Sequence, residues 1–168
     1  MELPGTSYLY RLALLGMTFM GFAAIVMLLR QTLGRHLRAF DVLFARVYME
    51  FAVIVSMGAM LPPLLMLWEL PIGAVWRLSS GLVGVPLLVI ALGYPARRRA
   101  TTRELTPHYV RVNVTIILLI SVTLLIVATG TLHEQSGPAF LAALTAFLTL
   151  VLVAWLRALS IILVPEAD

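Results

Sequence analysis

The sequence contains no cysteine and no lysine, and only 12 % of its 168 residues are charged. Without cysteine the chain has no disulfide bond, no thiolate metal ligand, no cysteine nucleophile and no covalent haem attachment through Cys-x-x-Cys-His. The usual indicator of the redox compartment is therefore missing. All twelve basic residues are arginine, which we interpret as a bias in genome composition and not as part of a mechanism.

The low charge excludes an ordinary soluble domain. Soluble domains are about 45–50 % apolar and about 25 % charged, whereas this chain is 61 % apolar, with a mean hydropathy of +1.01. A soluble domain of this length exposes too much surface to hide so many apolar side chains. A pI near 10.1 would otherwise raise nucleic acid as a partner. Because the arginines lie in short stretches between apolar runs, they are typical of topology determinants, and we predict no nucleic-acid partner.

Five apolar runs predict an all-α, polytopic membrane protein, with one integral membrane domain over residues 1–168 folded as a helical bundle. The first run lacks a basic amino-terminal cluster and a small-residue cleavage site, so we interpret it as a retained helix and not a signal peptide. The third run is short and rich in glycine and proline. The predicted helices cover residues 8–29, 37–68, 78–94, 110–132 and 139–164.

The second run carries the most irregular sequence. Pro62 and Pro63 each lack an amide donor, which predicts a kinked helix, or one that ends early and continues as a re-entrant piece. Broken helices often mark transporter sites because their freed backbone groups can coordinate a substrate. Gly58, Pro62 and Pro63 are therefore candidate transport residues. A re-entrant 47–94 region would remove two crossings and keep both arginine-rich stretches on one side.

Glu50 is a charged residue near the start of the same run, and intramembrane charges are candidate functional groups because they are costly to bury. It lies four residues after Arg46, so the two side chains can pair on one helix face. Since both lie close to the predicted interface, where long side chains reach water, we favour a structural anchor over proton or ion handling.

Nine of the twelve arginines lie in two stretches, residues 30–46 and 97–111. An excess of arginine in short loops marks the cytoplasmic side, which predicts an inner (plasma) membrane protein with its amino terminus outside and its carboxyl terminus cytoplasmic. We interpret residues 30–46 as an interfacial helix or the lead-in to the next helix, and residues 93–112 as a loop. The arginines predicted to contact anionic lipid headgroups are Arg35, Arg38, Arg97, Arg98, Arg99 and Arg103.

No catalytic constellation is visible, since the sequence has no HExxH, no GxSxG and no Ser/His arrangement. The three histidines lie in separate predicted loops, so we predict no catalytic residue, no metal site and no cofactor. The hydroxyl residues of the last two helices, from Thr115 to Ser160, are expected to form interhelical hydrogen bonds.

The leading interpretation is a non-enzymatic protein that acts through helix–helix association, as a structural or accessory subunit. Its expected partners are the lipid bilayer and either further copies of the chain or another membrane protein. Small residues at four-residue spacing support close helix packing: Ala139/Ala143, Ala142/Ala146 and Ser80/Gly84. The alternative is a small oligomeric transporter or channel that uses Glu50 and the broken region from Gly58 to Pro63.

Overall fold

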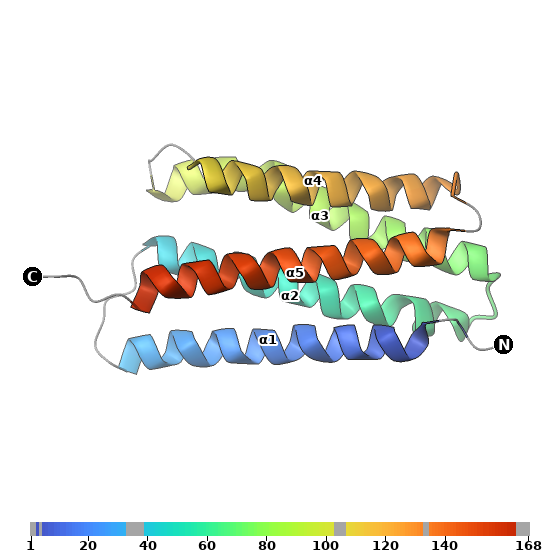
Figure 1. Ribbon diagram of the computed structural model, residues 1–168, viewed down its shortest axis with the longest axis horizontal. Helices are drawn as coiled ribbons and strands as arrows, with labels where there is room; N and C mark the ends of the chain where they lie inside the picture. Colours follow the sequence, from blue (N-terminus) through green and yellow to red (C-terminus); the bar gives the residue numbers. More distant parts are fainter. Residues whose placement is uncertain (1–2, 4, 33–38, 103–106, 133–134, 164–168) are drawn as a thin grey trace, which may run out of the picture.

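The computed structural model describes residues 3, 5–32, 39–102, 107–132 and 135–163, and within these ranges the regular structure is entirely helical. Five helices run alternately up and down as a bundle (Figure 1). Each is long and apolar enough to cross a membrane, which confirms the predicted five-helix, all-α, multi-pass architecture. Their bounds are α1 Thr6–Thr32, α2 Ala39–Met66, α3 Ile72–Thr102, α4 His108–Thr129 and α5 Ser136–Leu163.

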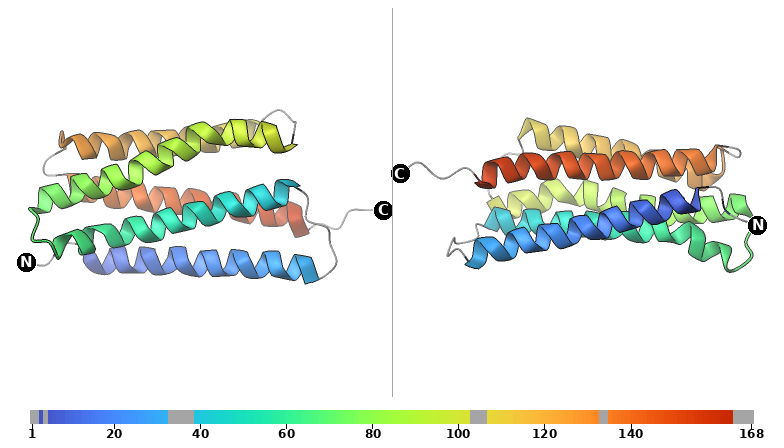
Figure 2. Two further views of the ribbon diagram at one scale, coloured as in Figure 1. Left: turned by 180° about the vertical axis from the view of Figure 1, so that it is seen from behind. Right: turned by 60° about the horizontal axis from the view of Figure 1, so that its bottom comes forward.

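The bundle is built from two antiparallel pairs, α1 with α2 and α3 with α4, which meet where α2 packs on α3. Helix α5 lies against these pairs and contacts all four other helices (Figure 2). Helix α1 packs almost entirely on α2, touches α5 only slightly, and makes no contact with α3 or α4. It is therefore the least integrated helix of the bundle.

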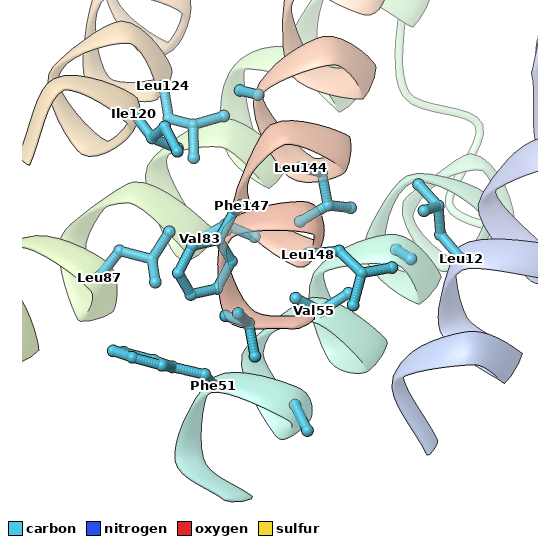
Figure 3. Close-up of a cluster of buried hydrophobic side chains, with 14 of the residues drawn as sticks. Leu12, Phe51, Val55, Val83, Leu87, Ile120, Leu124, Leu144, Phe147 and Leu148 are labelled. Atoms are coloured by element: carbon cyan, nitrogen blue, oxygen red, sulfur yellow. The ribbon is translucent and has the colours of Figure 1, made fainter. Parts of the chain in front are cut away.

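The core follows the inner face of α5, where apolar side chains recur every three or four residues. Phe147 of α5 lies among Val83 and Leu87 of α3 and Phe51 of α2 (Figure 3). The rings of Phe51 and Phe147 meet edge to face, with centroids 5.1 Å apart, a favoured geometry for aromatic pairs. The buried residues of this α5 face are Phe140, Ala143, Leu144, Phe147, Leu148, Val151 and Trp155.

Helix α2 differs from the early-ending or re-entrant alternative. It is a continuous α-helix through Pro62 and Pro63 to Met66, and Pro62 is fully buried. In lipid an unravelled segment would leave backbone groups without hydrogen-bond partners, whereas neighbouring helices can support a proline-containing helix. Helices α2 and α3 are therefore two separate helices, each long and apolar enough to cross a membrane.

The sequence predicted a short third helix, but α3 is the longest of the five helices, with 31 residues. It begins at Ile72, so Trp76 and Arg77 belong to the helix, although the predicted helices left residues 69–77 between them. It also continues through Pro86 and Pro95 into the arginines that were predicted to lie in a loop. The prediction failed because proline and charge were treated as helix ends, although a proline-containing helix packed against neighbours can persist.

The predicted interfacial helix over residues 30–46 is likewise divided between two long helices. Helix α1 continues to Thr32, and residues 39–46 form the first turns of α2, as the lead-in alternative proposed. Residues 33–38 lie outside the described residues, and so do residues 103–106 between α3 and α4.

Two glycines lie close to the first turns of α3, at the end of the bundle where α4 ends and α5 begins. Gly130 ends α4 in the left-handed conformation, at φ +81°, and a Cβ there would lie 2.4 Å from Cζ of Arg77. A Cβ at Gly137 would lie 2.9 Å from the Trp76 ring. The left-handed φ favours glycine at Gly130, and the close Trp76 ring favours glycine at Gly137, so both glycines let the first turns of α3 pack near the ends of α4 and α5.

Candidate functional site

One end of the bundle gathers most of the arginines that the structure describes. The carboxyl-terminal ends of α1, α3 and α5 and the amino-terminal ends of α2 and α4 lie together there, on the left in Figure 1. The up-and-down topology thus brings residues 39–46 and 97–102 to the same end. We call this the arginine-rich end, and it contains Arg46, Arg97, Arg98, Arg99, Arg111 and Arg157.

Glu50 is the carboxylate that two arginines of this end contact. Arg46 donates from Nε to Oε1 of Glu50 at 3.1 Å, which confirms the predicted pairing, and Arg97 donates from Nη1 to Oε2 at 3.2 Å. The carboxylate therefore joins α2 to α3. Both arginines are well exposed, so each pair is worth about 0.2–1 kcal/mol at most. Sequence reasoning missed Arg97, because 47 residues separate it from Glu50.

An aromatic layer lies just inside the charged groups. Trp155 of α5 is buried between Phe19 of α1 and Tyr48 of α2, with ring centroids 5.7 and 5.6 Å away. Further out, the guanidinium of Arg157 lies over the Tyr109 ring, 4.9 Å from its centroid, a cation–π contact. Tyr48 and Trp155 thus pack into the bundle.

The arginines predicted to contact headgroups occupy different environments. Arg97 and Arg99 are exposed on α3, whereas Arg98 is buried, with 4 % exposed, beside the hydroxyl of Tyr94. Arg35, Arg38 and Arg103 fall outside the described residues.

The candidate transport residues do not join Glu50 in one site. Gly58 lies eight residues further along α2, about 12 Å by helical rise. A Cβ at Gly58 would lie 2.7 Å from Val83 of α3 and 3.6 Å from Leu144 of α5. Pro62 is fully buried and Pro63 half-buried in the same bundle. Gly58 therefore serves close packing of α2 on α3, and its surroundings are apolar.

The hydroxyl groups of α4 correct the expectation of interhelical bonds. Thr115, Ser121 and Thr123 each donate to the carbonyl oxygen four residues earlier in their own helix, at 2.8–2.9 Å. These hydroxyls are satisfied locally because a helix offers that carbonyl within reach of threonine and serine. Asn113 is half-buried in the first turns of α4.

Two interhelical bonds occur, one at Thr145, where the sequence predicted it, and one at Ser56, which sequence reasoning missed. Ser56 of α2 donates to the Ala13 carbonyl of α1 at 3.3 Å, and the hydroxyls of Tyr8 and Thr145 lie 2.8 Å apart. Thr145 already donates its proton to the Leu141 carbonyl, at 2.7 Å. Since a threonine hydroxyl has a single proton, Tyr8 is the donor to Thr145.

A groove of about 730 Å³ opens on the outside of α5, between α1 and α4. It is lined by Tyr8 of α1, Ile116 of α4 and seven α5 residues between Leu141 and Val153. The floor includes Ala142 and Ala146, a pair that the sequence singled out for small size. Helices α1 and α4 stand apart here and leave the pair uncovered, which the sequence alone does not indicate.

In the described ranges, no three histidine, aspartate or glutamate side chains lie close enough together to hold a metal ion. His36 and His133 are outside those ranges, and His108 begins α4. No protein-family model matches the chain, and no curated protein and no solved structure matches it.

Proposed function

We propose that this multi-pass membrane protein is non-enzymatic and acts through helix–helix association, as a structural or accessory subunit. The observation that carries the proposal is the uncovered outer face of α1. Leu14, Ile25 and Leu28 are each more than half exposed on this face. They share it with Thr18 and Gly21, because steps of three and four residues keep all five on one side of a helix.

Gly21 is the informative member of this face. A Cβ at Gly21 would meet nothing within 4 Å. A glycine costs about 1 kcal/mol relative to alanine inside a helix in water, and membrane helices use small residues where another backbone approaches closely. Gly16, Gly58 and Gly84 are all covered by a neighbouring helix of this chain. We infer that Gly21 is covered by a helix of another chain.

The test is native mass spectrometry of the protein purified from its own membranes in mild detergent. The wild type should carry a stoichiometric second subunit or form a discrete homo-oligomer, and Gly21→Leu should lose that association. Gly73→Leu is the matched control, because Gly73 also has open space around it but lies in the first turn of α3. A wild type that is monomeric without a partner, or a Gly21→Leu variant that associates normally, would contradict the proposal.

We further propose that the arginine-rich end faces the cytoplasm of the plasma membrane, with the amino terminus outside. The support is the gathering of most of the described arginines at one end, since arginine is retained on the cytoplasmic side. The exposed guanidinium groups of Arg97 and Arg99 would then meet anionic headgroups. A reporter fused after Asp168 should be active only in its cytoplasmic form, and periplasmic or extracellular activity would reverse the assignment.

The alternative function, a small oligomeric transporter or channel, would need a polar path through the membrane. Gly58 and Pro62 are packed in apolar surroundings, and Glu50 is engaged by two arginines at the end of the bundle. These contacts favour association over transport. Ion flux into proteoliposomes that hold the wild-type protein, measured against empty vesicles, separates the two: a pH-dependent flux that Glu50→Gln abolishes would place transport first.

A further inference from the structure

The groove on the outside of α5 has a continuous floor on which the threonine hydroxyls are already hydrogen-bonded within the helix. Thr145 and Thr149 turn their hydroxyls to the carbonyls of Leu141 and Thr145 in their own helix, at 2.7 and 2.9 Å. Their methyl groups and the two alanines, Ala142 and Ala146, leave a shallow apolar channel. Near its far end the Tyr8–Thr145 hydrogen bond crosses from α1 to α5. A floor without unsatisfied donors suits a hydrocarbon occupant.

The groove ends at a fixed positive charge. Val153 is its last lining residue toward the arginine-rich end, and Arg157 follows one turn later on the same face of α5. On the α4 wall, Ile116 lies seven residues after Tyr109, again on one face of that helix. The contact between Arg157 and the Tyr109 ring therefore joins the α5 floor to the α4 wall at the arginine-rich end of the groove.

We propose that this groove binds one phospholipid with an acidic headgroup, from the leaflet at the arginine-rich end, with an acyl chain along α5 and the phosphate at Arg157. The dimensions agree. From Arg157 to Thr145 the helix rises about 18 Å, and one leaflet contributes about half of a 30 Å hydrocarbon core. An acyl chain whose phosphate meets Arg157 thus reaches the Tyr8–Thr145 bond. Arginine suits phosphate because its planar fork can donate two parallel hydrogen bonds.

The size of the groove favours a lipid over a protein helix. Nine residues line it, whereas a stable protein interface takes about 20–30 residues on each side. The positive charge at one end also has no role in docking an apolar helix, but it complements an anionic headgroup. The site is separate from the α1 face around Gly21, so the inference does not rest on the proposed association.

The experiment measures lipids retained by the full-length protein in native mass spectra, after incubation with equal amounts of phosphatidylglycerol and phosphatidylcholine of matched chains. The wild type should retain one phosphatidylglycerol with about tenfold preference, because a phosphate lipid with net negative charge gains a charge-assisted bond that a zwitterion partly satisfies internally. Arg157→Gln should bring the preference to about twofold or less. Ala146→Phe, which fills the floor, should lower the retention of both lipids.

Two control variants show whether the effects belong to the groove. Arg46→Gln removes an exposed arginine from the same end but from α2, and Ala96→Phe adds an exposed ring to α3. Both should retain phosphatidylglycerol as the wild type does, with thermal unfolding close to that of the wild type. Equal retention of the two lipids by the wild type would overturn the proposal. It would also be overturned if Arg46→Gln matched Arg157→Gln, or if Ala146→Phe released a protein subunit while lipid retention stayed unchanged.

Discussion

The two faces of α1 use glycine in opposite ways. On the inner face, a Cβ at Gly16 would lie 2.5 Å from Oγ of Ser56 and 3.3 Å from the Ala52 carbonyl oxygen of α2. On the outer face, five residues later, a Cβ at Gly21 would meet nothing. Close approach of two backbones explains the first glycine. Helix α1 therefore carries one glycine, Gly16, that packs on α2 of the same chain, and another, Gly21, that no part of the described chain covers.

The largest expected effect breaks the inner face. Gly16→Leu would force α1 away from α2, and overpacking of this kind costs about 1–3 kcal/mol, more where backbone must move. Because α1 has almost no other partner, the helix should detach as a unit. We expect a clear fall in the midpoint of thermal unfolding in detergent, followed by circular dichroism.

Gly21→Leu is the control for that measurement, since the added side chain enters open space. Its monomer should unfold at the wild-type temperature or slightly above, because leucine is the better helix former. Equal destabilisation by Gly16→Leu and Gly21→Leu would contradict the claim that only the inner face of α1 is closely packed.

A smaller effect is expected where α2 meets α3 at the charged end, which contrasts with the close packing of α1 on α2. Glu50→Gln removes the charge that engages Arg46 and Arg97. Since both guanidinium groups are well exposed, the loss should be at most about 1 kcal/mol. It should also vanish in about 1 M salt, where the screening length is about 3 Å. A salt-independent loss above that size would mean that Glu50 supports buried packing.

The sequence could predict the helices but not their contacts. Long uncharged runs indicate spanning helices because lipid requires backbone groups to be satisfied internally, and the structure has five helices long and apolar enough to span. Gly16 and Gly21 look alike in such a run, where nearly every position is apolar and no polar stripe indicates the inner face. That distinction depends on which helix α1 packs against, which is a tertiary property.

The candidate site shows the same division between local and distant information. The Arg46–Glu50 pair is visible because four residues bring two side chains to one helix face. The Arg97 contact needs the whole of α3 to be helical and packed on α2, whereas residues 93–112 were predicted as a loop. The groove on α5 is similar, since Ala142 and Ala146 predict tight packing but not that α1 and α4 stand apart over them.

The smallest expected effect sharpens the description of the inner α1 face. Ser56→Ala removes the hydroxyl that donates to Ala13 at 3.3 Å and to Ala52 at 2.9 Å, and interhelical hydrogen bonds in membranes average about 0.6 kcal/mol. Ser79→Ala is the matched control, because Ser79 is also buried, 0 % exposed against 8 % for Ser56, yet makes no hydrogen bond within the described residues. Removing an unsatisfied buried hydroxyl should be neutral or stabilising. If thermal unfolding showed the two alanine variants to be equally stable, the Ser56–Ala13 bond would contribute nothing, and the α1–α2 contact would rest on the close approach at Gly16 alone.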